Sequence, residues 1–157
     1  MNKKKKLIIE QTFSLAIKNH KNNNFQIAEN LYKKVLKINP NHFEALYYLG
    51  ILFGQIKRFD SAIPLLEKVI QTKPDHVIAL TNLGNMQGEL GEYQKAIINY
   101  EKAIAIQPDF LNAHYNFGLV LQKLGEHQKA ISSYEKAIAI QPSFAIAYTN
   151  LGNAQRS

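Results

Sequence analysis

The octapeptide EKAIAIQP at Glu101–Pro108 returns unchanged at Glu135–Pro142, one interval of 34 residues later. Prolines follow the same interval at positions 40, 74, 108 and 142. A fixed period of roughly 20–50 residues is typical of repeat proteins, in which each unit buries its apolar face against its neighbour. The sequence therefore predicts a stack of similar units, and stacked units usually act by recognition along an extended face.

Each period contains two helical patterns separated by a turn. In residues 77–110, Leu80, Leu83 and Gln87 recur at the spacing of one helix face. Gly91 then interrupts the pattern, as expected of a residue that tolerates positive φ after a helix end. A second amphipathic stripe follows and ends at Pro108, which cannot continue a helix. We expect each unit to be a helix, a tight turn and a second helix.

Small residues recur at one position of each helix. A larger side chain at these positions would push two packed helices apart, so we interpret both rows as close helix contacts. The rows are Ala16, Gly50, Gly84, Gly118 and Gly152 in the first helices, and Ala28, Ala62, Ala96 and Ala130 in the second.

The net charge of +7 is concentrated at the N-terminus. Residues 1–37 carry nine lysines and two acidic residues, whereas ten basic and ten acidic side chains cancel over residues 38–157. The lysines Lys3, Lys4, Lys5 and Lys6 could attract an anionic lipid or nucleic acid, but we favour a solvated, frayed terminus and expect no nucleic-acid partner. No apolar run is long enough to span a bilayer, and the absence of cysteine fits a cytoplasmic protein.

The recurring positions resemble the tetratricopeptide repeat (TPR) family over nearly the whole chain. The repeat 111–144 shows them as His114, Phe117, Gly118, Leu121, Ala130, Tyr134, Ala137 and Pro142. The resemblance implies an all-α fold, a right-handed α-solenoid of helix-turn-helix repeats. We expect a basic tail over residues 1–8 and one solenoid over 9–157, made of repeats 9–42, 43–76, 77–110 and 111–144 and a half repeat 145–157.

The half repeat retains Tyr148 and Leu151 in the repeat register. Terminal helices of solenoids normally carry a polar outer face. Either this helix serves as the cap or the native protein continues past Ser157, and we favour the second interpretation.

Signals of catalysis are missing from the sequence. It contains no phosphate-binding glycine motif, no nucleophile elbow and no histidine pair at metal-ligand spacing. His42 and His76 recur one period apart where Phe110 and Phe144 follow, which indicates packing at a turn. We therefore expect no enzyme activity, no cofactor and no metal within these residues.

Asparagines form the most informative polar set, which we call the asparagine row: Asn82, Asn116 and Asn150, one period apart on the first helices. In the family, first helices line a concave groove, and this position is similar to the asparagine ladder of the O-linked N-acetylglucosamine transferase repeats. An amide offers both a donor and an acceptor, so it can pair with a peptide backbone of any sequence. Alternatively, the asparagine at this position is a helix-surface residue that was inherited when the repeat was duplicated.

We expect the groove to bind an extended peptide or protein segment. Its candidate residues are the asparagine row with Asn85, Asn112, Tyr47, Tyr48 and Tyr115. The cations of the family's carboxylate clamp are absent, since its places hold residues such as Phe13, Ile17 and Tyr47. Two functions stay open: a binding module in its own right, or the substrate-recruiting N-terminal region of a larger enzyme such as a glycosyltransferase, with the catalytic part beyond Ser157.

Overall fold

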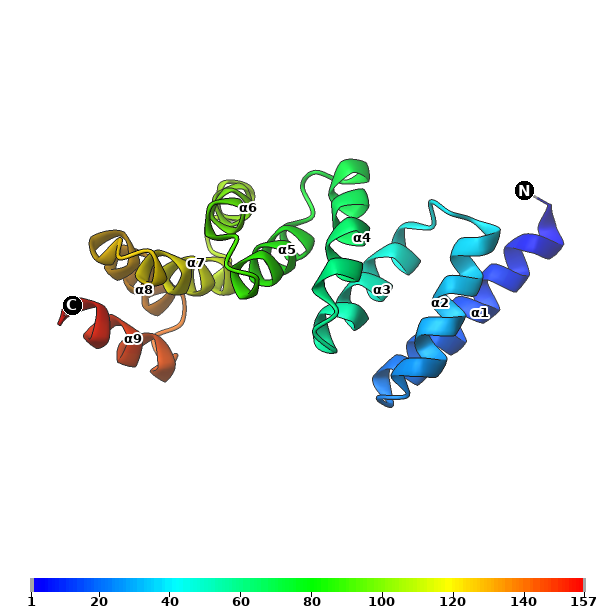
Figure 1. The fold of residues 1–157 in the computed structure, drawn as a ribbon, viewed down its shortest axis with the longest axis horizontal. Helices are drawn as coiled ribbons and strands as arrows, with labels where there is room; N and C mark the ends of the chain where they lie inside the picture. Colours follow the sequence, from blue (N-terminus) through cyan, green and yellow to red (C-terminus); the bar gives the residue numbers. More distant parts are fainter. Residues whose placement is uncertain (1, 157) are drawn as a thin grey trace. The chain divides into compact units, whose positions relative to one another are not determined.

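The computed structural model describes residues 2–156, and this part of the chain contains nine α-helices and no β-strand (Figure 1). The all-α solenoid fold predicted from the period is confirmed. The helices are α1 (Lys3–Lys21), α2 (Phe25–Ile38), α3 (Phe43–Gln55), α4 (Phe59–Thr72), α5 (Val77–Glu89), α6 (Tyr93–Ile106), α7 (Leu111–Lys123), α8 (His127–Ile140) and α9 (Ala145–Gln155). Odd-numbered helices are the first helices of the repeats, and even-numbered helices are the second. No helix within residues 2–156 is long and apolar enough to cross a membrane.

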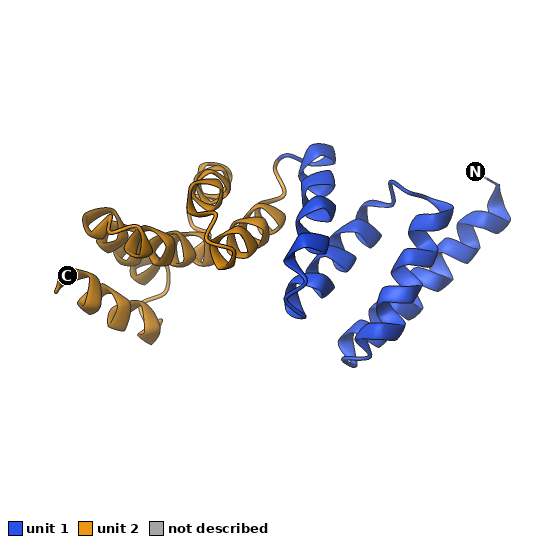
Figure 2. Ribbon diagram, viewed as in Figure 1, with its two compact units in different colours: residues 1–74 blue, residues 75–157 orange. Residues whose placement is uncertain are grey.

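The chain divides into two compact units (Figure 2). Unit 1 covers residues 1–74 and contains the helix pairs α1–α2 and α3–α4. Unit 2 covers residues 75–157 and contains the pairs α5–α6 and α7–α8, followed by α9. The division coincides with the expected end of a repeat near Pro74. A single continuous solenoid over residues 9–157 stays a prediction.

Helix α1 begins at Lys3, so the lysines expected in an irregular tail over residues 1–8 form its first turns. The side-chain oxygen of Asn2 caps the helix by accepting a hydrogen bond from the backbone N–H of Lys5 at 2.9 Å. Lysine has a high helix propensity, which favours extension of the helix beyond its packed part. Ile9 is the first buried residue of the helix, and the four lysines are exposed.

Small residues of the first helices lie against large side chains of the second. A Cβ atom at Gly84 would lie 2.8 Å from Cε1 of Tyr100, and one at Gly118 would lie 2.6 Å from Cε1 of Tyr134. Both tyrosine side chains are fully buried. The predicted close contact therefore exists, and it leaves no space for a side chain on the first helix. At Gly152 on α9, the last helix within residues 2–156, a Cβ atom would meet nothing within 4 Å.

Pro64 lies inside α4, beyond the first turn of the helix. A start near Asp60 or Ser61 would place Pro64 in or near the first turn, but α4 begins at Phe59 and the N–H of Ala62 already donates to the carbonyl of Arg58. Proline cannot donate to the carbonyl of Asp60 four residues earlier. Pro64 and Asp60 are both exposed, so water can satisfy that carbonyl.

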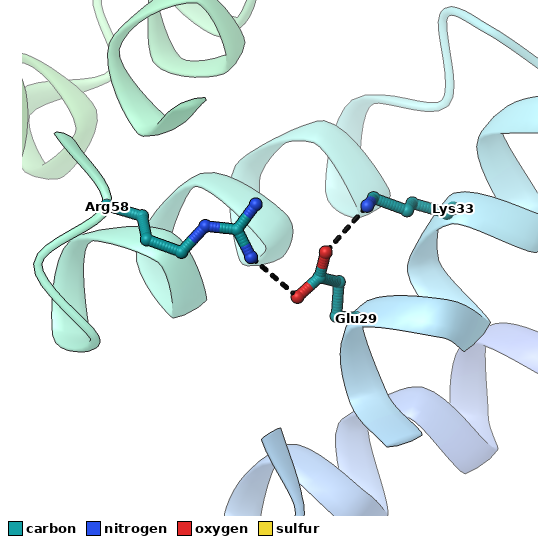
Figure 3. Close-up of polar contacts among 3 residues, drawn as sticks. All are labelled: Glu29, Lys33 and Arg58. Atoms are coloured by element: carbon teal, nitrogen blue, oxygen red, sulfur yellow. Dashed lines mark hydrogen bonds and ion pairs between the residues drawn. The ribbon is translucent and has the colours of Figure 1, made fainter. Parts of the chain in front are cut away.

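A buried carboxylate joins the two repeats of unit 1 (Figure 3). Glu29 on α2 has a side chain only 7% exposed, and its two oxygens lie 2.6 Å from Nζ of Lys33 and 3.0 Å from Nη1 of Arg58. The guanidinium of Arg58, which precedes α4, also lies 4.4 Å from the ring centroid of Phe53. Two cations thus compensate the burial of one negative charge.

The contact at Gly118 gives a stability prediction with an internal control. We expect Gly118→Leu to lower the free energy of unfolding by about 1–3 kcal/mol or more, because Tyr134 cannot yield the space. Gly152→Leu is the matched control at the same repeat position, and we expect it to be neutral or slightly stabilising because leucine favours the helix. Urea unfolding followed by circular dichroism measures both, and equal losses in the two variants would contradict the packing role.

The carboxylate of Glu29 gives a second prediction. Residues 63, 97 and 131 occupy its repeat position and are all isoleucine. We expect Arg58→Ala to destabilise the protein by about 1–3 kcal/mol, because Lys33 alone then compensates a buried charge. We expect Glu29→Ile to lower the free energy of unfolding by less than Arg58→Ala does, because no buried negative charge then remains. Thermal and urea unfolding test the order of the two variants, and the reverse order would show that the ion pairs add net stability.

Candidate functional site

A cleft in unit 2, which we call the α5–α7 cleft, brings together two of the predicted asparagines. Its volume is about 310 Å³. Polar side chains from three helices line it beside an apolar wall. The lining residues are Asn85, Gly88 and Glu89 of α5, Tyr100 of α6, and Asn116, Leu119, Val120 and Lys123 of α7.

Asn85 is the centre of the polar contacts in the α5–α7 cleft. Its side-chain oxygen accepts a hydrogen bond from the Tyr100 hydroxyl at 2.8 Å and another from the Asn116 amide nitrogen at 2.8 Å. Burial, and to a lesser degree the negative charge of Glu89, raises the pKa of Tyr100, so this phenol keeps its proton and donates. The carbonyl oxygen of Asn85 is thereby saturated, while its amide nitrogen can still donate two hydrogen bonds.

The repeats show why Asn85 takes this role. Tyr32 and Tyr134 occupy the same repeat position as Tyr100 on their second helices. Tyr134 donates to Gln122 at 2.9 Å, and the hydroxyl of Tyr32 lies 3.1 Å from Nδ1 of His20. The residue that corresponds to His20 and Gln122 is Gly88, which has no side chain to offer. Tyr100 therefore bonds to Asn85.

Two members of the asparagine row form hydrogen bonds within the protein, which the sequence did not predict. Just as Asn116 donates to Asn85 on the preceding first helix, Asn150 on α9 donates to the hydroxyl of Tyr115 on α7 at 3.0 Å. Each of these contacts uses the amide nitrogen and leaves the carbonyl oxygen able to accept. Asn82 is half-buried on α5, and Asn112 is exposed in the first turn of α7. A ligand role for the row stays a prediction.

The tyrosines chosen from the sequence lie in aromatic clusters. Tyr115 contacts Phe144, with ring centroids 5.0 Å apart. In unit 1, Tyr48 packs edge-on against Tyr47 at 5.2 Å and stacks on Tyr32 at 6.4 Å. Burial is the main cause that raises the pKa of Tyr47. The structure thus separates the candidates into a unit 1 group, Tyr47 and Tyr48, and a unit 2 group that contains the others.

A second cleft, which we call the α1–α3 cleft, lies within unit 1 and was missed by the sequence analysis. Its volume is about 320 Å³, and its lining residues are Ile17, His20, Lys21, Asn23, Tyr48, Ile51 and Gln55. Nε2 of His20 lies 2.8 Å from the side-chain oxygen of Gln55. His20 and Gln55 are 35 residues apart, which is one repeat period plus one residue. This spacing was the feature of the sequence that indicated their contact.

The turn histidines His42 and His76 form hydrogen bonds as well as packing contacts. Nδ1 of His42 accepts a hydrogen bond from the N–H of Ala45, and Nδ1 of His76 accepts one from Ala79, both at 3.2 Å. These side chains therefore cap α3 and α5, a role for which phenylalanine has no acceptor. Within residues 2–156 the structure contains no group of three or more side chains suited to a metal ion.

Family comparisons agree with the geometry. Two models described as "TPR repeat" and "Tetratricopeptide repeat" match residues 84–125 and 123–156, and residues 20–83, respectively. None of the curated proteins matches the sequence.

Solved structures show the same fold over most of this chain. A crystal structure of MamA protein is 35% identical over 95% of this chain and 81% of its own, with a TM-score of 0.90. Another MamA crystal structure is 37% identical over 90% of this chain and 82% of its own, with a TM-score of 0.86. YrrB, described as a TPR protein with an unusual peptide-binding site, is 20% identical over 91% of this chain and 74% of its own, with a TM-score of 0.80, and shows the fold alone. With family models that match most of its length, this chain belongs to the tetratricopeptide repeat family.

Proposed function

We propose that this chain is a non-catalytic protein-interaction module whose first helices hold an extended peptide or protein segment. The observation that carries the proposal is the amide pair in the α5–α7 cleft. Asn85 offers its amide nitrogen as a donor, because its oxygen already accepts two hydrogen bonds, and Asn116 offers its oxygen as an acceptor. A donor beside an acceptor matches the N–H and C=O groups of a peptide backbone.

The surroundings of the amide pair favour a ligand that is held mainly through its backbone. The Tyr100 ring and the apolar side chains of Leu119 and Val120 lie in the same cleft, beside one acidic and one basic residue, Glu89 and Lys123. Mixed charge gives little net selection for a charged ligand, whereas the apolar wall gives contact area to any side chain. One period later, Asn150 donates to the hydroxyl of Tyr115 and likewise keeps its side-chain oxygen able to accept.

The test begins with selection of binders from a random peptide library against the whole chain. The affinity of a recovered peptide is then measured by fluorescence anisotropy with the double variant Asn82→Ala, Asn116→Ala, which removes the acceptor of the amide pair together with the preceding member of the asparagine row. Two neutral hydrogen bonds are worth about 0.5–1.5 kcal/mol each, so we expect the affinity to fall roughly ten- to a hundred-fold. The loss should be similar for peptides of different sequence, and methylation of the peptide's backbone nitrogens should reproduce it.

Asn30→Ala is the matched control, because Asn30 is an exposed asparagine on the second helix α2. We expect it to leave the affinity unchanged. Circular dichroism establishes that each variant is folded. Undiminished binding by the folded double variant would show that the asparagine row is a product of duplication, and failure of the library to give any binder would contradict the proposed function.

A further inference from the structure

We propose that the α1–α3 cleft of unit 1 is a separate recognition site for acidic peptide segments, in which glutamate or aspartate side chains alternate with apolar ones. The proposal rests on the proposed function, since it assigns a ligand class to one part of the binding surface. It adds a selectivity that the amide pair of unit 2 does not provide.

Charge is distributed unevenly between the two units. Residues 1–74 carry thirteen lysine and arginine side chains and five acidic ones, a net charge of +8. Residues 75–157 carry six basic and seven acidic side chains, a net charge of −1. The positive charge of the chain therefore belongs to the unit that contains the α1–α3 cleft, and a surface of one sign attracts ligands of the other.

The polar side chains of the α1–α3 cleft offer hydrogen-bond donors to a ligand. The side-chain oxygen of Gln55 can only accept, so Nε2 of His20 donates to it. In the tautomer with its proton on Nε2, Nδ1 accepts from the hydroxyl of Tyr32, whose pKa is raised chiefly by burial, so that this hydroxyl stays protonated. With its oxygen engaged, Gln55 offers its amide nitrogen, a donor, to a cleft that Lys21 also lines.

No lining residue of the α1–α3 cleft is acidic. Glu29, the buried carboxylate of unit 1, is already compensated by Lys33 and Arg58. Glu44 lies 3.4 Å from His42. The donors of the cleft thus have no carboxylate of their own within it, in contrast to the α5–α7 cleft, where Glu89 accompanies Lys123.

The lining of the α1–α3 cleft suits a peptide better than a nucleic acid or a lipid surface. Ile17, Ile51 and the half-exposed Tyr48 give the α1–α3 cleft an apolar wall, which suits an apolar side chain of a peptide. A nucleic acid or a lipid surface needs several cations close together. Lys3–Lys6 form such a cluster, but Lys5 and Lys21 are separated by sixteen residues of one helix, roughly 24 Å. The cleft itself contains one lysine.

The test uses the full chain and three fluorescein-labelled synthetic peptides. In the first, glutamate alternates with leucine; in the second and third, glutamine or lysine replaces each glutamate. Fluorescence anisotropy at low and physiological salt measures the affinities. We expect the glutamate peptide to bind most tightly and the lysine peptide most weakly, with a preference that falls as salt is added.

Two variants locate the effect in the α1–α3 cleft. Lys21→Glu reverses the charge of the lining lysine, and Lys68→Glu makes the same change in net charge at an exposed position of α4. Loss of a charge-assisted hydrogen bond should weaken the glutamate peptide by about ten- to a hundred-fold in Lys21→Glu. Lys68→Glu should change the affinity by less than about threefold, because a distant surface charge is screened.

Gln55→Glu is the sharper variant, because it keeps the size of the side chain and the acceptor for His20. It replaces the amide donor by a negative oxygen, so the preference should shift from the glutamate peptide toward the lysine peptide. Equal affinities of the glutamate and glutamine peptides would overturn the inference, as would equal losses in Lys21→Glu and Lys68→Glu. Oligothymidine binding with the same dependence on Lys21 and Gln55 would assign the cleft to nucleic acid instead.

The outcomes separate this inference from the proposed function. Peptides that bind without regard to charge, and lose affinity in Asn82→Ala, Asn116→Ala but not in Lys21→Glu, would leave the proposed function standing and remove the acidic selectivity. Failure of all three peptides to bind would count against both.

Discussion

The contact between a small residue of a first helix and a large side chain of the second is the constraint on which each repeat depends. A Cβ atom at Gly84 or Gly118 would lie within 3 Å of a tyrosine ring, and at Gly50 it would lie 3.0 Å from Leu66. This contact fixes the separation of the two helices. Because the same contact buries the tyrosine ring, it also sets the position of the phenol hydroxyl of Tyr100 or Tyr134.

The buried rings connect the core to the binding surface. The hydroxyl of each of three tyrosines meets a polar side chain of a first helix, and that partner differs among the repeats: His20, Asn85 or Gln122. The second helices that supply Tyr100 and Tyr134 end in the same octapeptide. In these two repeats the second helices therefore supply a similar support, and the partners of the two hydroxyls differ because the first helices differ.

Much of this structure was predictable because repetition turns one observation into several. The 34-residue period predicted the helix pairs, and the small-residue row predicted the close contacts found at Gly84 and Gly118. The asparagine row was recognisable by its spacing, but its hydrogen bonds to Asn85 and Tyr115 depend on side-chain directions that periodicity does not specify. Two departures from the period were not interpreted: Glu29 stands where the other repeats have isoleucine, and Gly88 stands where the two other tyrosine-containing repeats have His20 and Gln122.

The uneven distribution of charge has a kinetic consequence. With a net charge of +8, unit 1 attracts anionic molecules before they touch it, over a distance of about 8 Å at physiological ionic strength. The nearly neutral unit 2 exerts no comparable pull. Encounter with an anionic partner therefore begins at the N-terminal half of the chain, and the rate of association, more than the lifetime of the complex, responds to salt.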